Sequence, residues 1–560
     1  MSRQDSSRWL ILPGLAAALA AVGAIVLDPA AWATHAALPG ATAERLEQLE
    51  DGATLLRWML VLSALALASM PWLMSLIARP RAKPSTTPDE SRQDWMFRIG
   101  LLAIGAGFIV RGLLYFSSLW YDEIVGLSFA LAEPVQIVSN LYDPANHIFH
   151  TVLAHIAIDI TGDVTVGLRL PALTASLLLI PILSWTGRDT DESPLFMATV
   201  ATFAALLPVC VYEGVEARGY SLMMLFAATQ IALFSRADTR SDARLWTVYA
   251  FLCALGIWAH LMTVWVPFGH GVYVLARCAS RRSVRDACLP LTALSLGALL
   301  TITLYAPALG DLVRGREMFA HAEATPGLFG EEGQHILWQL GGFWRPAMAI
   351  PGLLLFLIGV STLRDRPDRR RVWALSLLGL PCFIAFVAVA DTWIYARFAL
   401  FIMPGAILTM AWGFERVVKR FVAEGEGERA SVPFLILAAI ALMLMVANGT
   451  SGVKQPLRDA VQYVDAQPPA PKRVLAIGLA HEVLEIYATN DMDLRHSLRH
   501  GATLREDLDA HDPQWVIIYY PDRVDASRYD LLSARGFMLA EVFPGWVDWG
   551  RGNVEVWERK

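Results

Sequence analysis

The stretch "FRIGLLAIGAGFIVRGLLYFSSLWYDE", residues 97–123, joins an apolar run to two adjacent acids, Asp122 and Glu123. The apolar part is about as long as the roughly 20 residues that cross a bilayer core. Between Arg111 and Arg169 there is no Lys or Arg, so no basic residue close in sequence can neutralise the two acids. The stretch predicts a membrane helix followed by an acidic segment at the membrane surface.

The same kind of apolar run recurs along the whole chain. Of its 560 residues 55% are hydrophobic and 18% are charged, whereas soluble proteins average about 25% charged residues. We therefore expect a polytopic α-helical membrane protein. About 13 transmembrane helices are predicted, at 9–27, 53–77, 97–117, 164–187, 194–210, 219–235, 244–258, 261–278, 287–309, 336–361, 372–390, 394–415 and 432–448.

Three further features of the sequence bear on the kind of protein that it encodes. The first apolar run, 9–27, could also be read as a signal peptide, but a retained span is favoured. The net charge of -6 gives no reason to expect nucleic acid as a partner. The five cysteines form no CxxC or Cys/His cluster, so neither a disulfide framework nor a zinc site is indicated.

The distribution of Lys and Arg sets the orientation, because cytoplasmic loops are enriched in these residues. Basic stretches such as "RPRAK", "RCASRRSVR" and "RDRPDRRR" face the cytoplasm if the N-terminus is cytoplasmic. The loop 118–163 and the C-terminal segment then lie outside. The outside loops before that segment contain only Arg45, Arg218, Arg314, Arg316 and Arg397.

Residues 449–560 differ from the rest of the chain. The runs "RVLAIGLA", "WVIIYY", "GFMLAEVF" and "NVEVWE" are typical of strands, and "PLRDAVQYVDA" and "REDLDA" are typical of helices, so a small α/β domain is predicted. We expect three parts: residues 1–96 with two helices and a cytoplasmic loop, the membrane domain 97–448, and the extracytoplasmic domain 449–560.

Carboxylates and arginines meet on the predicted outer face. Arg218 in "YEGVEARGY" and Arg397 in "DTWIYARF" lie at outer ends of spans, as do Asp122 and Glu123. An arginine suits a phosphate because its planar guanidinium donates two parallel hydrogen bonds. A site for a phosphate-bearing lipid, with a carboxylate opposite, is one interpretation. Solvated loop ends, arginines that snorkel to headgroups, and hydrogen-bonded structural histidines are the alternatives.

These segments together resemble the GT-C superfamily of polyprenyl-phosphate-dependent glycosyltransferases. The bacterial protein O-mannosyltransferases and the aminoarabinose transferases of lipid A are the branches they are most similar to. The resemblance covers residues 97–560. It rests on "WYDE" after a membrane helix, "NHIFHTVLAHIAIDITGDVTVGLRLPAL", "EARGYSLMML", "YARFALFIMPG" and "PLRDAVQYVDAQ…RVLAIG".

The resemblance implies roles for individual residues. Asp122 matches the carboxylate proposed in this superfamily as the catalytic base or as the group that orients the acceptor, and its neighbour Glu123 would help to hold the acceptor or tune Asp122. Arg218 and Arg397 become candidates for holding the lipid phosphate. Asn146, His147 and Tyr220 stand in the matched segments on the donor side; where this chain has His147 many relatives have proline, which leaves its role open.

The implied reaction moves a sugar from a polyprenyl phosphate to an acceptor hydroxyl, with inversion, at the outer face of the bacterial inner membrane. No cofactor is obligatory, and a divalent cation such as Mg²⁺ or Mn²⁺ at the acidic pair is left open. The sugar and the acceptor (lipid, glycan or protein) are not indicated. The alternatives are a transporter or flippase for a lipid or sugar, and a non-catalytic scaffold.

Overall fold

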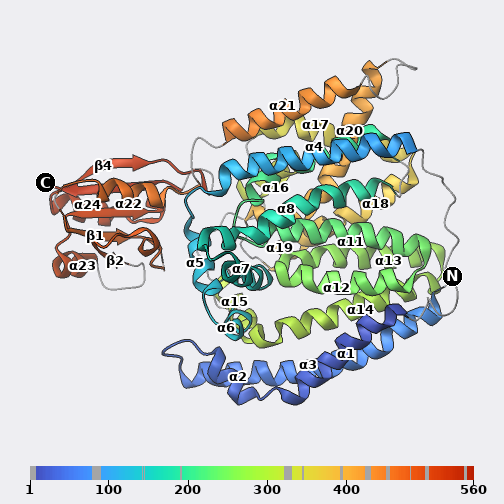
Figure 1. Cartoon of the computed structure of the whole chain (residues 1–560), viewed down its shortest axis with the longest axis horizontal. Coiled ribbons are helices and arrows are strands. Elements are labelled where there is room, and N and C mark those ends of the chain that lie inside the picture. The colour runs from blue at the N-terminus through green and yellow to red at the C-terminus, as the bar shows by residue number, and fades with distance from the viewer. Residues whose placement is uncertain are drawn as a thin grey trace. The chain divides into compact units, whose positions relative to one another are not determined.

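The computed structural model divides the chain into two compact units (Figure 1). Unit 1 is Met1–Leu113 with Phe129–Met445, and unit 2 is Leu114–Ser128 with Val446–Lys560. Leu114–Ser128 was expected in the membrane domain, but in the structure it belongs with the C-terminal strands; the boundaries at 96 and 448 stay predictions. The structure describes residues 8–78, 90–141, 143, 145–188, 192–320, 331–343, 346–390, 395–422, 431–449, 454–468, 470–479, 481–497, 504–547 and 552–560.

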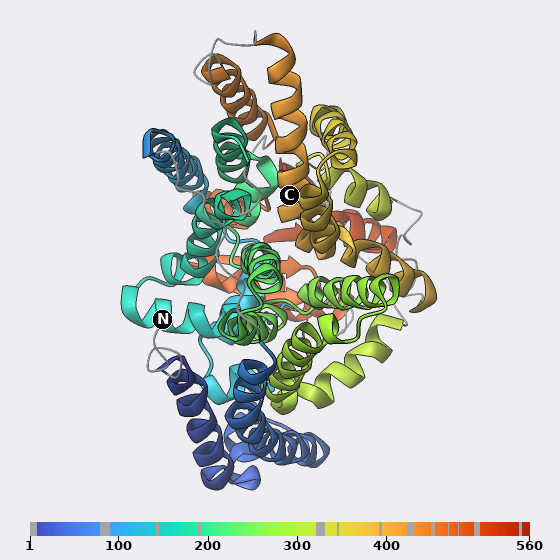
Figure 2. The ribbon, with the colours of Figure 1, turned by 90° about the vertical axis from the view of Figure 1, so that its right-hand side faces the viewer.

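Unit 1 is helical, and Figure 2 views several of its helices nearly end-on. Its α-helices are α1 (Ile11–Val26), α2 (Pro29–Ala36), α3 (Ala43–Ile77), α4 (Glu90–Tyr115, ending in unit 2), α6 (Pro134–Ser139), α7 (Ile148–Thr161), α8 (Val164–Arg188), α9 (Pro194–Leu206), α10 (Pro208–Glu213), α11 (Tyr220–Arg240), α12 (Ala243–Ala259), α13 (Trp265–Arg281), α14 (Arg285–Tyr305), α15 (Leu309–Ala320), α16 (Glu331–Gln339), α17 (Pro346–Ser361), α18 (Pro367–Leu377), α19 (Gly379–Ala390), α20 (Met403–Phe421) and α21 (Val432–Gly449, ending in unit 2). Short 3-10 helices are η1 (Arg8–Leu10), η2 (Leu261–Val264), η3 (Ala306–Ala308), η4 (Thr362–Arg364) and η5 (Ala396–Ile402).

The helices of unit 1 have the lengths and surfaces of membrane helices. Among the described residues, seven helices are long and apolar enough to span a bilayer, and the pair α1 and α2, bent by 89°, makes an eighth candidate. Leu102 and Leu113 on α4 are 72% and 80% exposed, which suits contact with lipid tails. Each predicted span overlaps at least one helix, but several, such as 336–361 and 372–390, cover parts of two helices, so the count of 13 stays a prediction.

The N-terminal helices are fastened to the rest of unit 1 by polar contacts. Helix α3 packs along α1, α2 and α14, an arrangement that both ribbon views show. Arg45 near the start of α3 forms an ion pair with the buried Asp311, and its Nη2 donates to Asn140 Oδ1 at 2.8 Å. Asp311 Oδ2 also accepts from the Leu141 amide at 2.7 Å. These contacts fix the segment just before the histidine-bearing helix α7.

A buried arginine donates hydrogen bonds to backbone carbonyls at the end of α9. Pro208 has no amide hydrogen and cannot continue the helix, so carbonyls in the last turn of α9 need other donors. Arg111, fully buried in α4, donates to Ala205 O at 2.7 Å and to Cys210 O at 3.0 Å, and its Nε donates to Ser176 Oγ at 2.7 Å. One guanidinium therefore joins α4, α8, α9 and α10, just ahead of the turn that carries Arg218.

Unit 2 is built on a mixed sheet of order β2-β1-β3-β5-β4. Strands β1, β2 and β3 run parallel to their neighbours, and β5 is antiparallel to β3 and β4. Central strand β3 is buried throughout, as expected for an apolar run covered on both faces. The elements are β1 (Lys472–Ile477), β2 (Met492–Ser497), β3 (Trp515–Tyr519), β4 (Phe537–Phe543), β5 (Val554–Arg559), α5 (Tyr121–Ala130, ending in unit 1), α22 (Leu457–Asp465), α23 (Leu504–His511), α24 (Ala526–Ala534), η7 (Glu485–Tyr487) and η8 (Pro521–Arg523).

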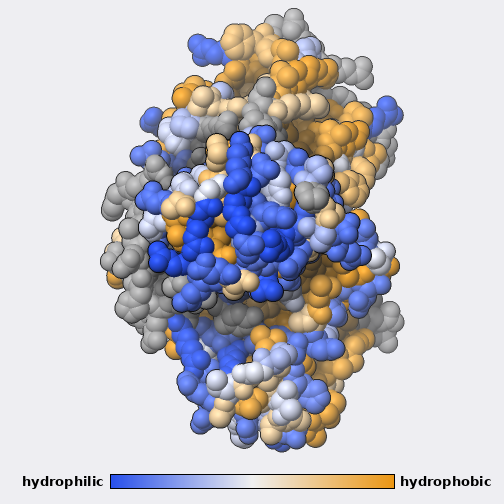
Figure 3. Space-filling view, turned by 90° about the vertical axis from the view of Figure 1, so that its left-hand side faces the viewer, coloured by the Kyte–Doolittle hydropathy of each residue, from blue (hydrophilic) through white to orange (hydrophobic). Residues whose placement is uncertain are grey.

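The predicted small α/β domain is confirmed, with one additional strand. Leu475, Ile477, Val516 and Ile518 from the sheet form its core with Leu504, Leu508, Leu532 and Phe537. The additional strand, β2, was not predicted because "MDLRHS" is polar and only its end residues are buried. Figure 3 views the side of Figure 1 on which the C-terminal strands lie, and most of the face toward the viewer is hydrophilic.

Candidate functional site

Arg218 lies in a buried turn between α10 and α11. Every residue of 194–224 is buried, so this guanidinium is held inside unit 1, and it is 4% exposed. Its amide donates to Glu216 O at 2.7 Å, and its Nη1 donates to Ala145 O at 3.3 Å. Ala145 immediately precedes Asn146 and His147, so the turn and the predicted donor-side segment are in direct contact.

Gly219 makes this contact possible. A Cβ on residue 219 would lie 2.3 Å from Ala259 O and 2.6 Å from His147 Nδ1. Both distances are far below van der Waals contact. The glycine in "EARGY" therefore lets the turn lie directly against His147 and the end of α12.

Three rings pack against each other beside Arg218. The ring centroid of His147 lies 5.4 Å from that of Tyr220 and 4.7 Å from that of His260, and Tyr220 and His260 are 4.9 Å apart. His147 immediately precedes α7, Tyr220 begins α11, and His260 follows α12. The Arg218 guanidinium carbon is 5.9 Å from the Tyr220 ring centroid. We refer to Arg218, Arg397, His147, Tyr220 and His260 as the arginine–histidine cluster.

Arg397 reaches the same cluster from η5. Its guanidinium carbon lies 4.3 Å from the Tyr395 ring centroid, and the next residue, Phe398, packs against His260 at 6.1 Å. Helix η5 also contacts α11 and η2, and the charge of Arg397 acts on both His147 and His260. Segments separated by nearly 180 residues in sequence thus bring both predicted arginines to one place.

Burial and the arginines keep the histidines of this cluster neutral. His147 and His260 lie in connections outside the spanning helices. Burial, and then the positive charge of Arg218, lowers the pKa of His147 well below its ordinary value. Burial and the charges of Arg218 and Arg397 lower the pKa of His260 to about 3. The positive charge therefore resides on the two guanidiniums.

Asn146 and His150 lie next to the cluster and have different surroundings. Asn146 Nδ2 donates to Ile137 O at 3.0 Å and to Asn140 O at 2.6 Å, which holds the loop before α7. Within the described part of the chain, Asn146 Oδ1 and His150 Nε2 are buried and make no hydrogen bond. Burial, and then the charge of Arg218, lowers the pKa of His150 to about 3. His155, in contrast, is hydrogen-bonded to Ala130 O at 2.8 Å.

The acidic pair lies at the first turn of α5, in unit 2. Asp122 is partly exposed, whereas Glu123 is fully buried. Glu123 Oε2 accepts from the Trp120 amide at 3.2 Å, so this carboxylate caps its own helix. The two neighbouring acids therefore have different environments, with Asp122 the accessible one.

The C-terminal domain holds this turn in place. The Tyr121 amide donates to Gln455 Oε1 at 3.0 Å, and the Leu119 amide donates to the Tyr487 hydroxyl at 2.7 Å. The Lys454 ammonium lies 3.8 Å from the Trp120 ring centroid, a cation–π contact. The acidic turn is thus an integral part of unit 2, which local sequence did not indicate.

The structure therefore groups the predicted site residues into two sets. Arg218, Arg397, His147 and Tyr220 lie together in unit 1, with Asn146 beside them. Asp122 and Glu123 lie in unit 2. Within the described ranges no His, Cys, Asp or Glu joins Asp122 and Glu123 in a three-ligand group, and the divalent cation at this pair stays a prediction.

His260 and His150 were not assigned to the site from sequence. His260 has no local motif, and His150 lies in the matched segment "NHIFH" but was given no role there; the place of both in the site arises from the packing of α7, α11 and α12. Arg45 and Arg314, which the sequence places on the same face, form ion pairs with Asp311 and Glu44. Both of these ion pairs lie outside the arginine–histidine cluster.

Comparison with known proteins identifies the fold. No protein-family model matches the sequence, and no curated protein sequence matches it. Among solved structures, apo ArnT from Cupriavidus metallidurans matches with a TM-score of 0.52 at 14% identity, over 84% of this chain and 98% of that one. The same protein bound to undecaprenyl phosphate matches with a TM-score of 0.50 at 13% identity, over 83% and 98%.

A third solved structure, the arabinosyltransferase EmbB from Mycobacterium smegmatis, matches with a TM-score of 0.43 at 13% identity, over 73% of this chain and 42% of that one. The two ArnT matches show the fold: this chain has the GT-C fold of a polytopic helical membrane protein with a small C-terminal sheet. The fold expected from the sequence is confirmed.

Proposed function

We propose that this protein is a membrane glycosyltransferase that moves a sugar from a polyprenyl phosphate to an acceptor hydroxyl, with inversion, on the outer face of the inner membrane. The observation that carries the proposal is the arginine–histidine cluster, where Arg218 and Arg397 flank buried, neutral histidines. Support comes from the GT-C fold, shared with an ArnT solved with bound undecaprenyl phosphate.

In the proposed reaction the cluster holds the donor phosphate. A guanidinium stays charged at any physiological pH and donates in a fork that fits two phosphate oxygens. The phosphate gains charge as it leaves, so fixed cations in a buried site stabilise the transition state more than the ground state. The unbonded Nε2 of His150 and Oδ1 of Asn146 are further polar groups that a donor headgroup could engage.

Asp122 acts as the base in this proposal. The bond between the anomeric carbon and the phosphate oxygen breaks, and the phosphate leaves with the electron pair. A bond forms between the same carbon and the acceptor oxygen, whose proton passes to Asp122. Glu123 acts as a positioning residue, because it caps the helix that carries Asp122.

The topology in this proposal is that of a multi-pass protein of the inner membrane, with the N-terminus in the cytoplasm and unit 2 outside. Membrane lipids surround unit 1, and the acceptor is a lipid, a glycan or a protein. The sugar would leave the lipid carrier at the membrane surface, where a polar acceptor can arrive from water.

The test is a gene deletion followed by mass spectrometry of the envelope glycans. We expect one sugar to be missing from one class of envelope molecule, and to return with the wild-type gene but not with Asp122→Asn. A transporter or a scaffold would tolerate Asp122→Asn, so full complementation by this variant, at wild-type protein level, contradicts the proposal.

A further inference from the structure

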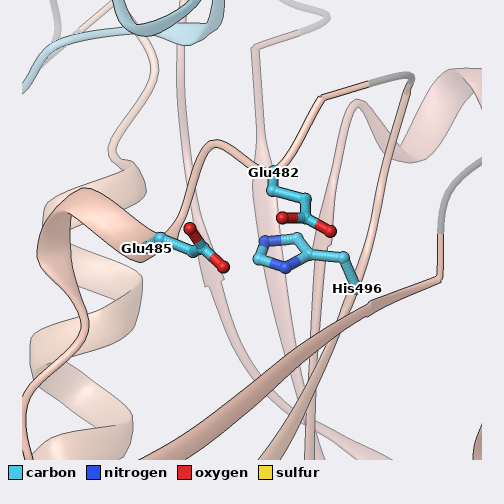
Figure 4. A group of neighbouring side chains, drawn as sticks. All are labelled: Glu482, Glu485 and His496. Atoms are coloured by element: carbon cyan, nitrogen blue, oxygen red, sulfur yellow. The ribbon is translucent and has the colours of Figure 1, made fainter. Parts of the chain in front are cut away.

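A group of potential metal ligands lies in unit 2, away from the acidic turn of α5. Glu482 and Glu485 follow β1, and His496 is in β2. One ligand atom of each residue lies within 4.8 Å of the other two. Figure 4 shows the imidazole of His496 beside the carboxyl groups of Glu482 and Glu485. A tetrahedral ion with bonds of about 2.1 Å holds its ligand atoms roughly 3.4 Å apart, so small side-chain movements would close the group around one ion.

The group lies at the edge of the sheet where α/β proteins bind ligands. Strands β1, β2 and β3 are parallel, so their carboxyl ends share one edge. Glu482 and Glu485 come after the carboxyl end of β1, and His496 is the next-to-last residue of β2. In open α/β sheets, ligands occupy the crevice outside the carboxyl ends of the strands.

The electrostatic state of the group also favours a cation. Within the described part of the chain, His496 Nε2 is buried and makes no hydrogen bond. A neutral imidazole offers the lone pair of a ring nitrogen to a metal ion. No described Lys or Arg forms an ion pair with Glu482 or Glu485, although their carboxylates are close together. Like charges at this spacing are unfavourable until a cation binds between them.

We propose that Glu482, Glu485 and His496 bind a divalent transition-metal ion of the zinc class. An imidazole ligand favours zinc over magnesium or calcium, which prefer sites made only of oxygen ligands. Three protein ligands leave the fourth position of a tetrahedral ion to water. This site is separate from the acidic pair, and its ligands need no role in sugar transfer.

The ion would brace the turn that carries the proposed base. Glu485 and Tyr487 belong to the same short helix η7, and the Tyr487 hydroxyl accepts from the Leu119 amide at 2.7 Å. The His481 ring, next to Glu482, packs against Tyr121 at 6.0 Å. A metal that joins η7 to β2 therefore restricts the residues that support the first turn of α5.

The first experiment is titration of the chelator-treated, full-length protein in detergent with ZnCl₂, followed by calorimetry. We expect one saturable zinc site assigned to this group. Glu485→Gln and His496→Gln should each weaken zinc binding about tenfold or more. The matched controls are Glu506→Gln and His35→Gln, which replace exposed residues outside the group and should leave zinc affinity unchanged.

The variants also separate this site from the acidic pair. Asp122→Asn should retain the zinc site, and MgCl₂ or CaCl₂ should not compete with zinc. If wild-type protein has no saturable zinc site, or if folded Glu485→Gln binds zinc as tightly as wild type, the proposal is wrong. Glu485 is exposed, so its variant keeps the test valid if His496→Gln fails to fold.

Hydrogen exchange measures whether bound zinc restricts the residues that support the first turn of α5. Zinc should slow exchange in peptides covering 482–497 and in the peptide containing the Leu119 amide, in wild type but not in Glu485→Gln. Equal exchange at Leu119 with and without bound zinc would mean that the metal does not brace the first turn of α5.

Discussion

The arginine–histidine cluster of unit 1 and the acidic turn of unit 2 are built in opposite ways. In the first, Arg218 is buried beside the ring of Tyr220 and donates to Ala145 O, and burial with the arginine charges keeps His147 and His260 neutral. In the second, Asp122 is partly exposed, and the contacts around it hold its helix through backbone amides. The buried cluster is suited to hold one negatively charged group of a ligand. The partly exposed turn is suited to a side chain that contacts an incoming acceptor.

The sharpest test of this contrast is Asp122→Asn. The amide cannot take the acceptor proton, so we expect sugar transfer to fall about 10³-fold, while undecaprenyl phosphate binding and thermal stability stay at wild-type values. Transfer assays with a radiolabelled donor and a binding titration on the same preparation measure both. If donor binding fell in parallel with transfer, the separation of the two roles would be wrong.

Arg111→Met tests what supports the cluster. The substitution leaves carbonyls at the end of α9 without their donor, so we expect a loss of about 3 kcal/mol in unfolding free energy. Thermal unfolding in detergent measures it, with Arg314→Met as the control, because Arg314 is exposed and pairs with Glu44. If both variants were equally stable, Arg111 would have no bracing role.

Arg218→Gln removes one cation of the cluster and keeps a polar side chain. We expect transfer to fall about 10²-fold, the usual effect of losing one group that stabilises developing charge, with weaker binding of undecaprenyl phosphate. The control Arg314→Gln removes an exposed arginine that pairs with Glu44 outside the cluster, and this variant should transfer sugar at the wild-type rate. An equal loss of sugar transfer in both variants would mean that the effect comes from overall surface charge and not from the cluster.

Gly219→Ala changes the contacts that the turn makes with Ala259 and with His147. The new Cβ would lie 2.6 Å from His147 Nδ1, so the turn must shift and we expect about a tenfold loss of donor affinity. Gly105→Ala is the control, because a Cβ at residue 105 meets nothing within 4 Å. Unchanged affinity in Gly219→Ala would mean that the packing of the rings does not matter for the donor.

The smallest effect concerns pH. His260 has a pKa of about 3 in the folded protein and an ordinary value near 6.5 when unfolded. The unfolded state then binds more protons between these values, so stability falls as pH drops below about 6.5 and is flat above it. At pH 5.5 we expect a loss of about 1 kcal/mol in unfolding free energy from this residue.

Thermal unfolding of wild type and His260→Gln from pH 5.5 to 8 measures this loss, and we expect stability to depend less steeply on pH in the variant. Equal slopes in the two proteins would mean that His260 is not the titrating group.

The sequence predicted the parts of the molecule that depend on local pattern. Apolar blocks indicated the helices, and alternating or apolar runs indicated β1, β3, β4 and β5. Strand β2 was missed because an edge strand such as "MDLRHS" buries few of its side chains. The Glu482, Glu485 and His496 group was missed with it, because its ligands come from a loop and a strand with no local spacing motif.

The site was predictable where a segment carries its own motif. "EARGY" and "YARF" indicated Arg218 and Arg397, and "WYDE" indicated Asp122. The positions of His260 and His150 depend on how α7, α11 and α12 pack, and the membership of α5 in unit 2 depends on Gln455 and Tyr487, more than 300 residues away. No local pattern encodes contacts of this kind.

The most direct test of the account is the affinity of purified protein for undecaprenyl phosphate in three variants measured side by side. We predict that the double variant Arg218→Gln/Arg397→Gln loses most of its affinity, while Asp122→Asn and Arg314→Gln bind as wild type does. Wild-type affinity in the folded double variant would contradict the claim that the arginine–histidine cluster holds the donor phosphate.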